Sequence, residues 1–264
     1  MAEKYKTLLF DCSDGVATVT LNRPENANAM NVELMQELLA VANLCDEDAA
    51  IRVVLITGTG RYFSVGGDLK AFYYAEGGAG HSVKEATAFF HPALARFARM
   101  MKPLVVAVNG TAAGAGLSLA ILGDYVIAAD TAKFTMSYTR AGLSPDGGAT
   151  FLLPRLVGLR RTQELMLMNK VLTAEQALEW GLINEVAPAA GLEEAASGIV
   201  HEFARGPTRA FGSVKQLLME SASASLETQM EREARAIARN ARGGEGQEGM
   251  AAFLDKRQPD FTGK

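Results

Sequence analysis

Short apolar runs bounded by turn residues dominate the first part of the chain. Tyr5 to Asp11 and Val16 to Asn22 are separated by Ser13-Asp14-Gly15, a pattern that predicts a β-hairpin. Asn31 precedes apolar residues at helical spacing and predicts a helix that continues to about Asp46. The run Arg52 to Gly58 is rich in β-branched residues, which is typical of a strand buried on both faces.

Two turns built from small residues each follow one of these apolar runs. Ser64 to Leu69 comes after the run that ends at Gly58, and Gly110 to Leu117 comes after Leu104 to Gly110. Each turn leads into an apolar stretch that can begin a helix. Either turn alone is explained by tight packing of a strand on a helix. The repeated layout favours a site, because two such units can aim two backbone N–H groups at one carbonyl oxygen.

The middle of the chain adds strands, a helix and a glycine-rich stretch. Tyr125 to Ala129 and a short strand around Phe134 complete the predicted sheet. Phe89 to Met101 has a helical pattern that stops before a proline. Ala71 to Ser82 is rich in glycine, so we expect a mobile surface loop near the first turn.

The last part of the chain is helical by pattern. Thr173 to Gln176 is a capping box that predicts a helix ending near Trp180, and almost everything beyond Gly191 has helical periodicity. We therefore expect an α/β core over residues 1–190 and a helical region over residues 191–264. Such a tail buries little by itself, so it should pack on the core, on a sister subunit, or on both.

Composition narrows the classes of function. The chain has 264 residues, a net charge of −4 and no lysine- or arginine-rich block, which argues against nucleic acid or a membrane surface as a partner. The N-terminus lacks the apolar core of a signal peptide. Cys12 and Cys45 form no disulfide framework or zinc pattern, and His81, His91 and His201 are widely spaced. We expect a reduced cytoplasmic protein without a metal site.

Glycine motifs of other chemistries do not match this chain. Gly58-Thr59-Gly60 and Gly114-Ala115-Gly116 do not complete a dinucleotide fingerprint, and no phosphate loop is present. Gly116 to Ala120 lacks the last glycine of a nucleophile elbow, so Ser118 is interpreted as a packed helix residue. Asp146 is the acid most suited to chemistry, although the residues alone slightly favour a turn or N-cap aspartate.

Six short motifs stand in a characteristic order along the chain. They are Asn22 to Glu25, Phe63 to Leu69, Asn109 to Gly116, Gly142 to Gly148, Leu172 to Ala177 and Gly181 to Ile183. Together they resemble the enoyl-CoA hydratase/isomerase (crotonase) superfamily, over nearly the whole chain. The ending, Phe253 to Lys264, is most similar to the family's phenylacetate-pathway isomerases, which act on epoxidised phenylacetyl-CoA.

The resemblance implies an architecture and an assembly. The fold would be α/β, a crotonase (ClpP-like) spiral of ββα units with a helical C-terminal trimerisation region. The assembly would be a homotrimer or a homohexamer. The ligand would be an acyl-CoA thioester, with coenzyme A as part of the substrate and no separate cofactor.

The resemblance also implies site residues by motif position. The backbone amides of Gly67 and Ala115 would form an oxyanion hole for the thioester carbonyl. Alanine at position 115 keeps the N–H group, so the hole survives that change. The residues expected to border or bind the CoA arm are Arg23, Asn28, Ala29, Ser64, Gly66, Asp68 and Leu69.

Departures from the family pattern concern the catalytic acids. Ser118 and Tyr138 occupy the positions where hydratases of the family carry two glutamates that position and deprotonate water. Neither is a competent carboxylate base, since an unperturbed tyrosine has a pKa of roughly 10. Asp146 occupies a position where isomerases of the family often place an acid. The resemblance therefore favours a 1,3-proton shift with Asp146 as the base.

Three other functions stay open at this point. Hydration by a one-carboxylate route would use the same residues. A dehalogenase of the family places a nucleophilic aspartate at Asp146, a histidine near His91 and a tryptophan where this chain has Tyr138, so His91 is a candidate second active-site group. A non-catalytic member that binds acyl-CoA or RNA is favoured slightly by the missing glutamates. The two turns, Asp146 and the acidic charge weigh against it.

Overall fold

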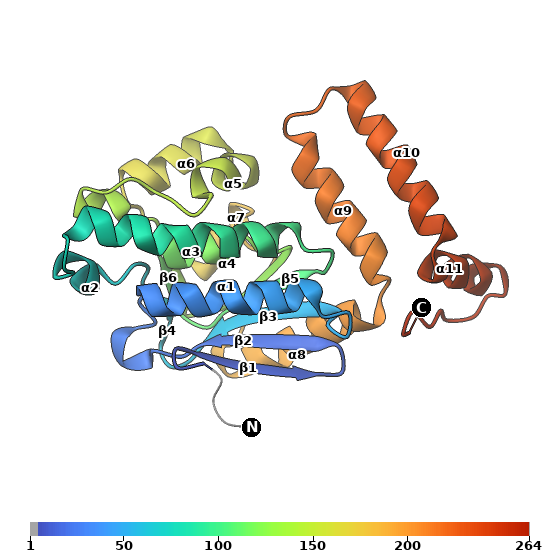
Figure 1. The fold of residues 1–264 in the computed structure, drawn as a ribbon, viewed down its shortest axis with the longest axis horizontal. Helices are drawn as coiled ribbons and strands as arrows, with labels where there is room; N and C mark the ends of the chain where they lie inside the picture. The colour runs from blue at the N-terminus through green and yellow to red at the C-terminus, as the bar shows by residue number, and fades with distance from the viewer. Residues whose placement is uncertain (1–4, 264) are drawn as a thin grey trace.

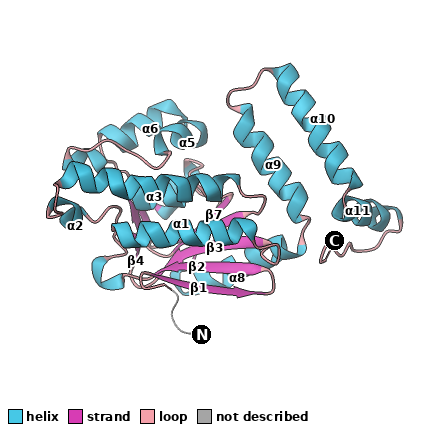
Figure 2. Cartoon of the chain, viewed as in Figure 1, coloured by secondary structure: helices cyan, strands magenta, loops and turns pink. Residues whose placement is uncertain are grey.

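The computed structural model describes residues 5–263, and two sheets organise it. The larger sheet has the strand order β1 (Leu8–Ser13), β2 (Val16–Leu21), β3 (Val53–Gly58), β5 (Leu104–Val108), β7 (Tyr125–Ala129) and β10 (Glu185–Ala187). The smaller sheet has the order β4 (Tyr62–Ser64), β6 (Thr111–Ala113), β8 (Lys133–Thr135) and β9 (Leu172–Thr173). Helices lie over and beside the large sheet (Figure 2).

Successive strand pairs divide between the two sheets and make the chain a spiral. β3, β5 and β7 pair in parallel in the large sheet, and the strands that follow them, β4, β6 and β8, pair in parallel in the small one. Each strand pair leads into a helical segment: α2 (Leu69–Tyr73), α4 (Ala115–Ala120) or η2 (Tyr138–Ala141). The expected crotonase architecture of repeated ββα units is confirmed.

Local predictions near the chain's first and last strands are also confirmed. β1 and β2 form the antiparallel hairpin. Asn31 caps α1 (Val32–Glu47), because its Oδ1 accepts the Leu34 N–H at 3.0 Å. Thr173 and Gln176 form the capping box of α7 (Ala174–Glu179). Side-chain oxygens at these positions satisfy amides that the helix itself leaves unpaired.

Helices cover both faces of the large sheet, so the sheet is the centre of the core. α1 and α3 (Ala79–Arg99) pack against each other over one face (Figure 1). α8 (Leu192–Arg205) covers the other face, where Val200 meets Val53 and Val105. β5 is buried along its whole length, as a strand between two helical layers must be.

The prediction of a mobile loop over Ala71 to Ser82 is wrong. α2 fills the start of this stretch, and α3 already begins at Ala79. Gly78 has a φ of +84°, which lets the chain reverse between the two helices. The first half of α3 lies before the helix that the sequence predicted from Phe89. Side chains four residues apart along it are buried on one face: Ser82, Ala86 and Phe90. Burial of that face outweighs the low helix propensity of the glycines.

The remaining helices lie between the elements named above or follow α8. They are η1 (Pro24–Asn26), α5 (Ala149–Leu156), α6 (Gly158–Leu167), η3 (Ala189–Gly191), α9 (Thr208–Ser221), α10 (Leu226–Arg242) and α11 (Gly244–Leu254). α9 and α10 run side by side and extend from the core in Figure 1. Among the described residues, no helix has both the length and the apolar character that a membrane span requires.

Buried polar contacts fix the C-terminal helices to the core. Lys215 of α9 contacts Asp124 at 2.7 Å, and Arg52 donates to the main-chain oxygens of Ala204 and Gly206 at 2.6 and 2.7 Å. Burial lowers the pKa of Lys215, while the charge of Asp124 raises it. α8 lies beyond residue 190 but packs on the sheet, and only α9 to α11 extend from it. The division of the chain at residue 190 stays a prediction.

Candidate active site

Two glycine turns lie in direct contact at the start of α2 and α4. Gly66 has a φ of +96° and Gly114 a φ of +53°, values that favour glycine in both turns. A Cβ at Gly66 would lie 2.9 Å from the Ala113 oxygen and 3.1 Å from the Ala115 nitrogen. Only the absence of a side chain at Gly66 allows the two turns to approach so closely.

Gly67 and Ala115, the residues that follow Gly66 and Gly114, line the same cavity. The neighbours of Gly67 bond to Met30, since Met30 N donates to Gly66 O at 2.7 Å and Asp68 N donates to Met30 O at 3.0 Å. The N–H of Gly67 therefore points to the opposite side of the backbone, because strand amides alternate. Ala115 begins α4, so its N–H has no acceptor within that helix. Both residues line a cavity of about 360 Å³.

Asp146 lines the same cavity and is held at both carboxylate oxygens. The Tyr138 hydroxyl donates to Oδ1 at 2.6 Å, and the His91 Nε2 lies 3.0 Å from Oδ2. The main-chain oxygen of Asp146 accepts the Ser118 hydroxyl at 2.9 Å. The structure therefore brings Asp146, Gly67, Ala115 and Tyr138 to one cavity, and His91 and Ser118 contact Asp146 without lining that cavity.

Tyr138 and Ser118 are hydrogen-bond donors in this arrangement. Burial raises the pKa of Tyr138 above its ordinary value, and the neighbouring Asp146 charge raises it further. Its hydroxyl therefore keeps its proton and donates a hydrogen bond to the carboxylate. Ser118 is fully buried in α4, and its hydroxyl is directed to the Asp146 main chain. Asp146 is thus the only carboxylate that lines the cavity within residues 5–263.

The residues predicted to border the CoA arm divide into exposed and buried sets. Asn28 and Ser64 are fully buried: Asn28 donates to Tyr62 O at 2.8 Å, and Ser64 donates to Asn28 O at 2.8 Å. Arg23 pairs with Asp68 at 3.2 Å, and Asp68 also caps α2 through the Ala71 amide. These side chains hold the loop together.

The Arg23 guanidinium also contacts the main-chain oxygen of Ala29, a buried residue of the same loop. Leu69 is half exposed and lines the cavity beside Gly67. Contact of the seven residues with CoA stays a prediction. Asn28 and Ser64 are 0% exposed, main chain included, so in this structure they support the loop from within.

Three buried apolar residues are among the cavity-lining residues that the sequence did not predict. Met35 of α1, Phe72 of α2 and Ala86 of α3 form the buried apolar part of the lining. Phe72 lies in the stretch that was expected to be a loop, and so does the start of the helix that carries Ala86. The helical spacing of Ser82, Ala86 and Phe90 is the signal that identifies this wall.

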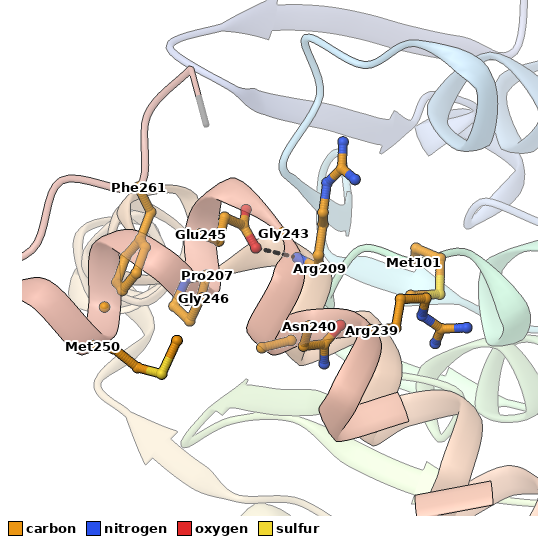
Figure 3. Close-up of a pocket in the computed structure, with 12 residues that line it drawn as sticks. Met101, Pro207, Arg209, Arg239, Asn240, Gly243, Glu245, Gly246, Met250 and Phe261 are labelled. Carbon is orange, nitrogen blue, oxygen red and sulfur yellow. Dashed lines mark hydrogen bonds between the residues drawn. The ribbon is translucent and has the colours of Figure 1, made fainter. Parts of the chain in front are cut away.

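A larger cavity, of about 540 Å³, lies elsewhere and has different chemistry. It is formed at the C-terminal helices, where Glu245 accepts the Arg209 amide at 2.9 Å and Phe261 lies at the edge (Figure 3). It contains none of the groups that contact Asp146. Among the described residues, no cluster of His, Cys, Asp or Glu is suited to hold a metal ion.

Comparison with known proteins decides the family. The family model described as enoyl-CoA hydratase/isomerase matches residues 11–264. The chain belongs to this family. It is 41% identical to 1,2-epoxyphenylacetyl-CoA isomerase of Escherichia coli K12, over 97% of this chain and 98% of that protein. The family is one of enzymes that act on acyl-CoA thioesters, and this chain is therefore an enzyme of the crotonase superfamily.

Two further relatives bear on fold and on chemistry. The solved structure of an enoyl-CoA hydratase from Bacillus anthracis superposes with a TM-score of 0.92 at 30% identity, covering 98% of this chain and 100% of that one. A 4-chlorobenzoyl coenzyme A dehalogenase of an Arthrobacter species is 33% identical over 84% of this chain and 80% of its own length. The family thus contains different reactions on one fold, and the specific reaction must be argued from the site.

The contact between the two turns can be tested with Gly66→Ala. We expect turnover of enoyl-CoA substrates to fall by about 100-fold, because the new Cβ would displace the turns and misplace an oxyanion donor. Gly181→Ala is the matched control: Gly181 has a φ of +75°, but a Cβ there would lie 3.7 Å from its nearest neighbour, the main-chain oxygen of Leu156. Both variants should lose about 1–2 kcal/mol of stability through backbone strain. Equal activity of the two would contradict the role assigned to this contact; thermal melting and steady-state kinetics measure both effects.

Proposed function

We propose that this enzyme isomerises enoyl-CoA thioesters by a 1,3-proton shift, with Asp146 as the base that removes and returns the proton. One observation carries the proposal: Asp146 lines the same cavity as the amides of Gly67 and Ala115. A single carboxylate beside two carbonyl-polarising amides is sufficient for an isomerisation. The two glutamates of a hydratase are replaced by two hydrogen-bond donors, Ser118 and Tyr138.

The proposed reaction consists of two proton transfers. The carboxylate of Asp146 removes a proton from C2 of a 3-enoyl thioester, and the electron pair moves into a dienolate. The amides of Gly67 and Ala115 donate to the thioester oxygen, where negative charge develops. The protonated Asp146 then returns the proton to C4, giving the 2-enoyl thioester and restoring the carboxylate. No water, metal ion or external proton donor is consumed.

The contacts of Asp146 suit a group that must accept and release a proton. Tyr138 holds Oδ1 and His91 holds Oδ2, yet each carboxylate oxygen has a second lone-pair site. Contacts from two separate elements, η2 and α3, therefore orient the acid without using its capacity to take a proton. We propose His91 and Tyr138 as positioning residues, and Arg23, Asn28, Ala29, Ser64, Gly66, Asp68 and Leu69 as the border of the CoA arm.

Hydrolytic dehalogenation is a second candidate, favoured by the 3.0 Å contact between His91 and Asp146. In that reaction the Asp146 carboxylate would displace chloride from an aryl-CoA and form an ester, which water would hydrolyse with His91 as the base. The dehalogenase pattern has a tryptophan where this chain has Tyr138, which directs its hydroxyl to the acid instead. The isomerase therefore fits the site better.

We also propose that the protein self-associates through its C-terminal helices. Large apolar side chains of α9, α10 and α11 are exposed in the single chain, including Leu218 at 69%, Ile237 at 71% and Phe253 at 83%. Exposed apolar side chains on this scale favour a protein partner. The apolar cavity at the same helices (Figure 3) extends this surface.

Asp146→Asn tests the base. We expect this variant to bind acyl-CoA while its turnover falls by about 10²–10⁴-fold, because an amide cannot accept the substrate proton. Asp14→Asn is the control: Asp14 lies in the β1–β2 turn at a φ of +51°, a conformation that asparagine also tolerates. Undiminished turnover in Asp146→Asn would remove Asp146 from the mechanism. Steady-state kinetics and calorimetric binding of a saturated acyl-CoA provide the two readouts.

Product identification separates the candidate reactions. With a 3-enoyl-CoA as substrate, we expect the 2-enoyl-CoA to accumulate without a 3-hydroxyacyl product, because the site has one carboxylate in place of the two glutamates of a hydratase. Separate incubations with a 2-enoyl-CoA and with 4-chlorobenzoyl-CoA complete the panel. Conversion of the 2-enoyl-CoA to a 3-hydroxyacyl-CoA would establish hydration instead, and chloride release would establish dehalogenation. Mass spectrometry identifies each product.

Self-association is tested by light scattering. We expect a mass of three times the 28.1 kDa chain, or six times that mass if two trimers combine. Ile237→Glu should shift the distribution toward the single chain, because a charge in an apolar interface loses its hydration without a partner. Glu233→Gln, on the same helix, is a control for the change of charge. A single-chain mass for the unmodified protein at micromolar concentration would contradict the proposal.

A further inference from the structure

The short helix α4 is fixed against the first turn, Ser64 to Leu69. All six residues of α4 are buried. A Cβ at Gly116, its second residue, would lie 2.8 Å from the Ser64 Cβ and 2.9 Å from the Ser64 Oγ. α4 therefore packs on the first turn through a residue without a side chain, and it has no room to move closer to that turn.

The loop that carries Asp146 packs on the same helix at Ser118. A Cβ at Gly147 would lie 2.9 Å from the Ser118 Cβ, and 3.1 Å from side-chain atoms of Leu94 and Phe90. Leu94 and Phe90 belong to α3, so the loop is enclosed between α3 and α4. Gly147 has a φ of +63°, and the loop can approach this closely because glycine has no side chain.

The Ser118 hydroxyl holds the main chain of the base, whereas His91 and Tyr138 hold its carboxylate. The hydroxyl donates to the Asp146 main-chain oxygen at 2.9 Å. Its oxygen also lies 3.3 Å from the Tyr138 hydroxyl and 3.4 Å from the Gly114 main-chain oxygen. One fully buried side chain thus contacts the base loop, the tyrosine that holds Oδ1 and the second glycine turn.

From these contacts we infer that Ser118 is a positioning residue that sets how far the Asp146 carboxylate lies from the amide of Ala115. Its hydroxyl holds the Asp146 main chain, and its small size lets the loop approach α4. Gly116 and Ser118 are two residues apart and face different sides of the helix, so α4 cannot move toward the first turn to make room. The inference rests on the proposed function for the roles of Asp146 and Ala115.

Ser118→Ala tests the hydroxyl. We expect kcat for 3-hexenoyl-CoA to fall by about tenfold, because the base loses a hydrogen bond that fixes its position. The affinity and stoichiometry of hexanoyl-CoA binding, measured by calorimetry, should not change, since Ser118 does not line the cavity. The matched control is Ser213→Ala, because Ser213 is a buried serine of α9 whose hydroxyl donates to the Arg209 main-chain oxygen at 2.9 Å. Equal kcat values in the two variants would contradict the inference.

The same substitution in Asp146→Asn separates positioning of the base from general damage to the site. A residue that acts only through the carboxylate has no effect once the carboxylate is absent. We therefore expect Ser118→Ala to change the residual turnover of Asp146→Asn by less than about twofold. A loss as large as the one in the unmodified enzyme would overturn the inference.

Ser118→Val tests the size of the side chain. A methyl carbon in place of Oγ would lie 2.9 Å from the Asp146 main-chain oxygen, whereas carbon and oxygen pack at about 3.3 Å or more. We expect the loop to move and kcat to fall by at least about 100-fold, since a displacement of about 1 Å has effects of that size. Melting and the stoichiometry of hexanoyl-CoA binding show whether the variant is folded. A folded Ser118→Val with the kcat of Ser118→Ala would contradict the role of size.

The double variant also distinguishes failure of the inference from failure of the proposed function. If the enzyme hydrates 2-hexenoyl-CoA without isomerising 3-hexenoyl-CoA, and the Ser118→Ala loss in hydration disappears in Asp146→Asn, the positioning role stands and the proposed reaction falls. If 3-hexenoyl-CoA is isomerised through Asp146 and the two losses multiply, the reaction stands and the positioning role falls.

Discussion

The contact between two glycine turns is the constraint on which the site depends. Gly66 and Gly114 each adopt a positive φ directly before a residue that lines the cavity. A Cβ on Gly66 would come within 3.1 Å of the Ala115 nitrogen, so the two turns can lie this close only because that atom is missing. The repeated ββα unit supplies the geometry, since it delivers each turn from one sheet to the next helix in the same way.

The acid is held by elements that are distant in the sequence. α3 contributes His91, η2 contributes Tyr138 and α4 contributes Ser118, and all three direct polar atoms to Asp146. Burial keeps the Tyr138 proton on its oxygen, so the donor to Oδ1 does not compete with the acid for a proton. The result is one carboxylate held at both oxygens, in a wall that is mostly apolar.

The C-terminal helices are stabilised differently from the core. α1, α3 and α8 bury apolar side chains on the sheet, whereas α9 is fixed by Lys215 on Asp124. α10 buries only Ala236 along its length. These helices have few contacts with the core and many exposed apolar side chains. Such a segment is stabilised more by packing on another surface than by its own contacts.

Sequence pattern determined the parts of this protein that depend on local chemistry. Asn31, the Thr173 capping box and the β1–β2 turn specify their own hydrogen bonds, and the two turn motifs with Asp146 pointed to the family and the site. Tertiary structure alone decided that Ala71 to Ser82 contains the end of α2 and the start of α3, because burial of Ala86 and Phe90 offsets the glycines around them. It also decided what contacts Asp146. Its side-chain partners lie 55 residues away at His91 and eight away at Tyr138, and only the packing of α3 and η2 brings their side chains to one carboxylate.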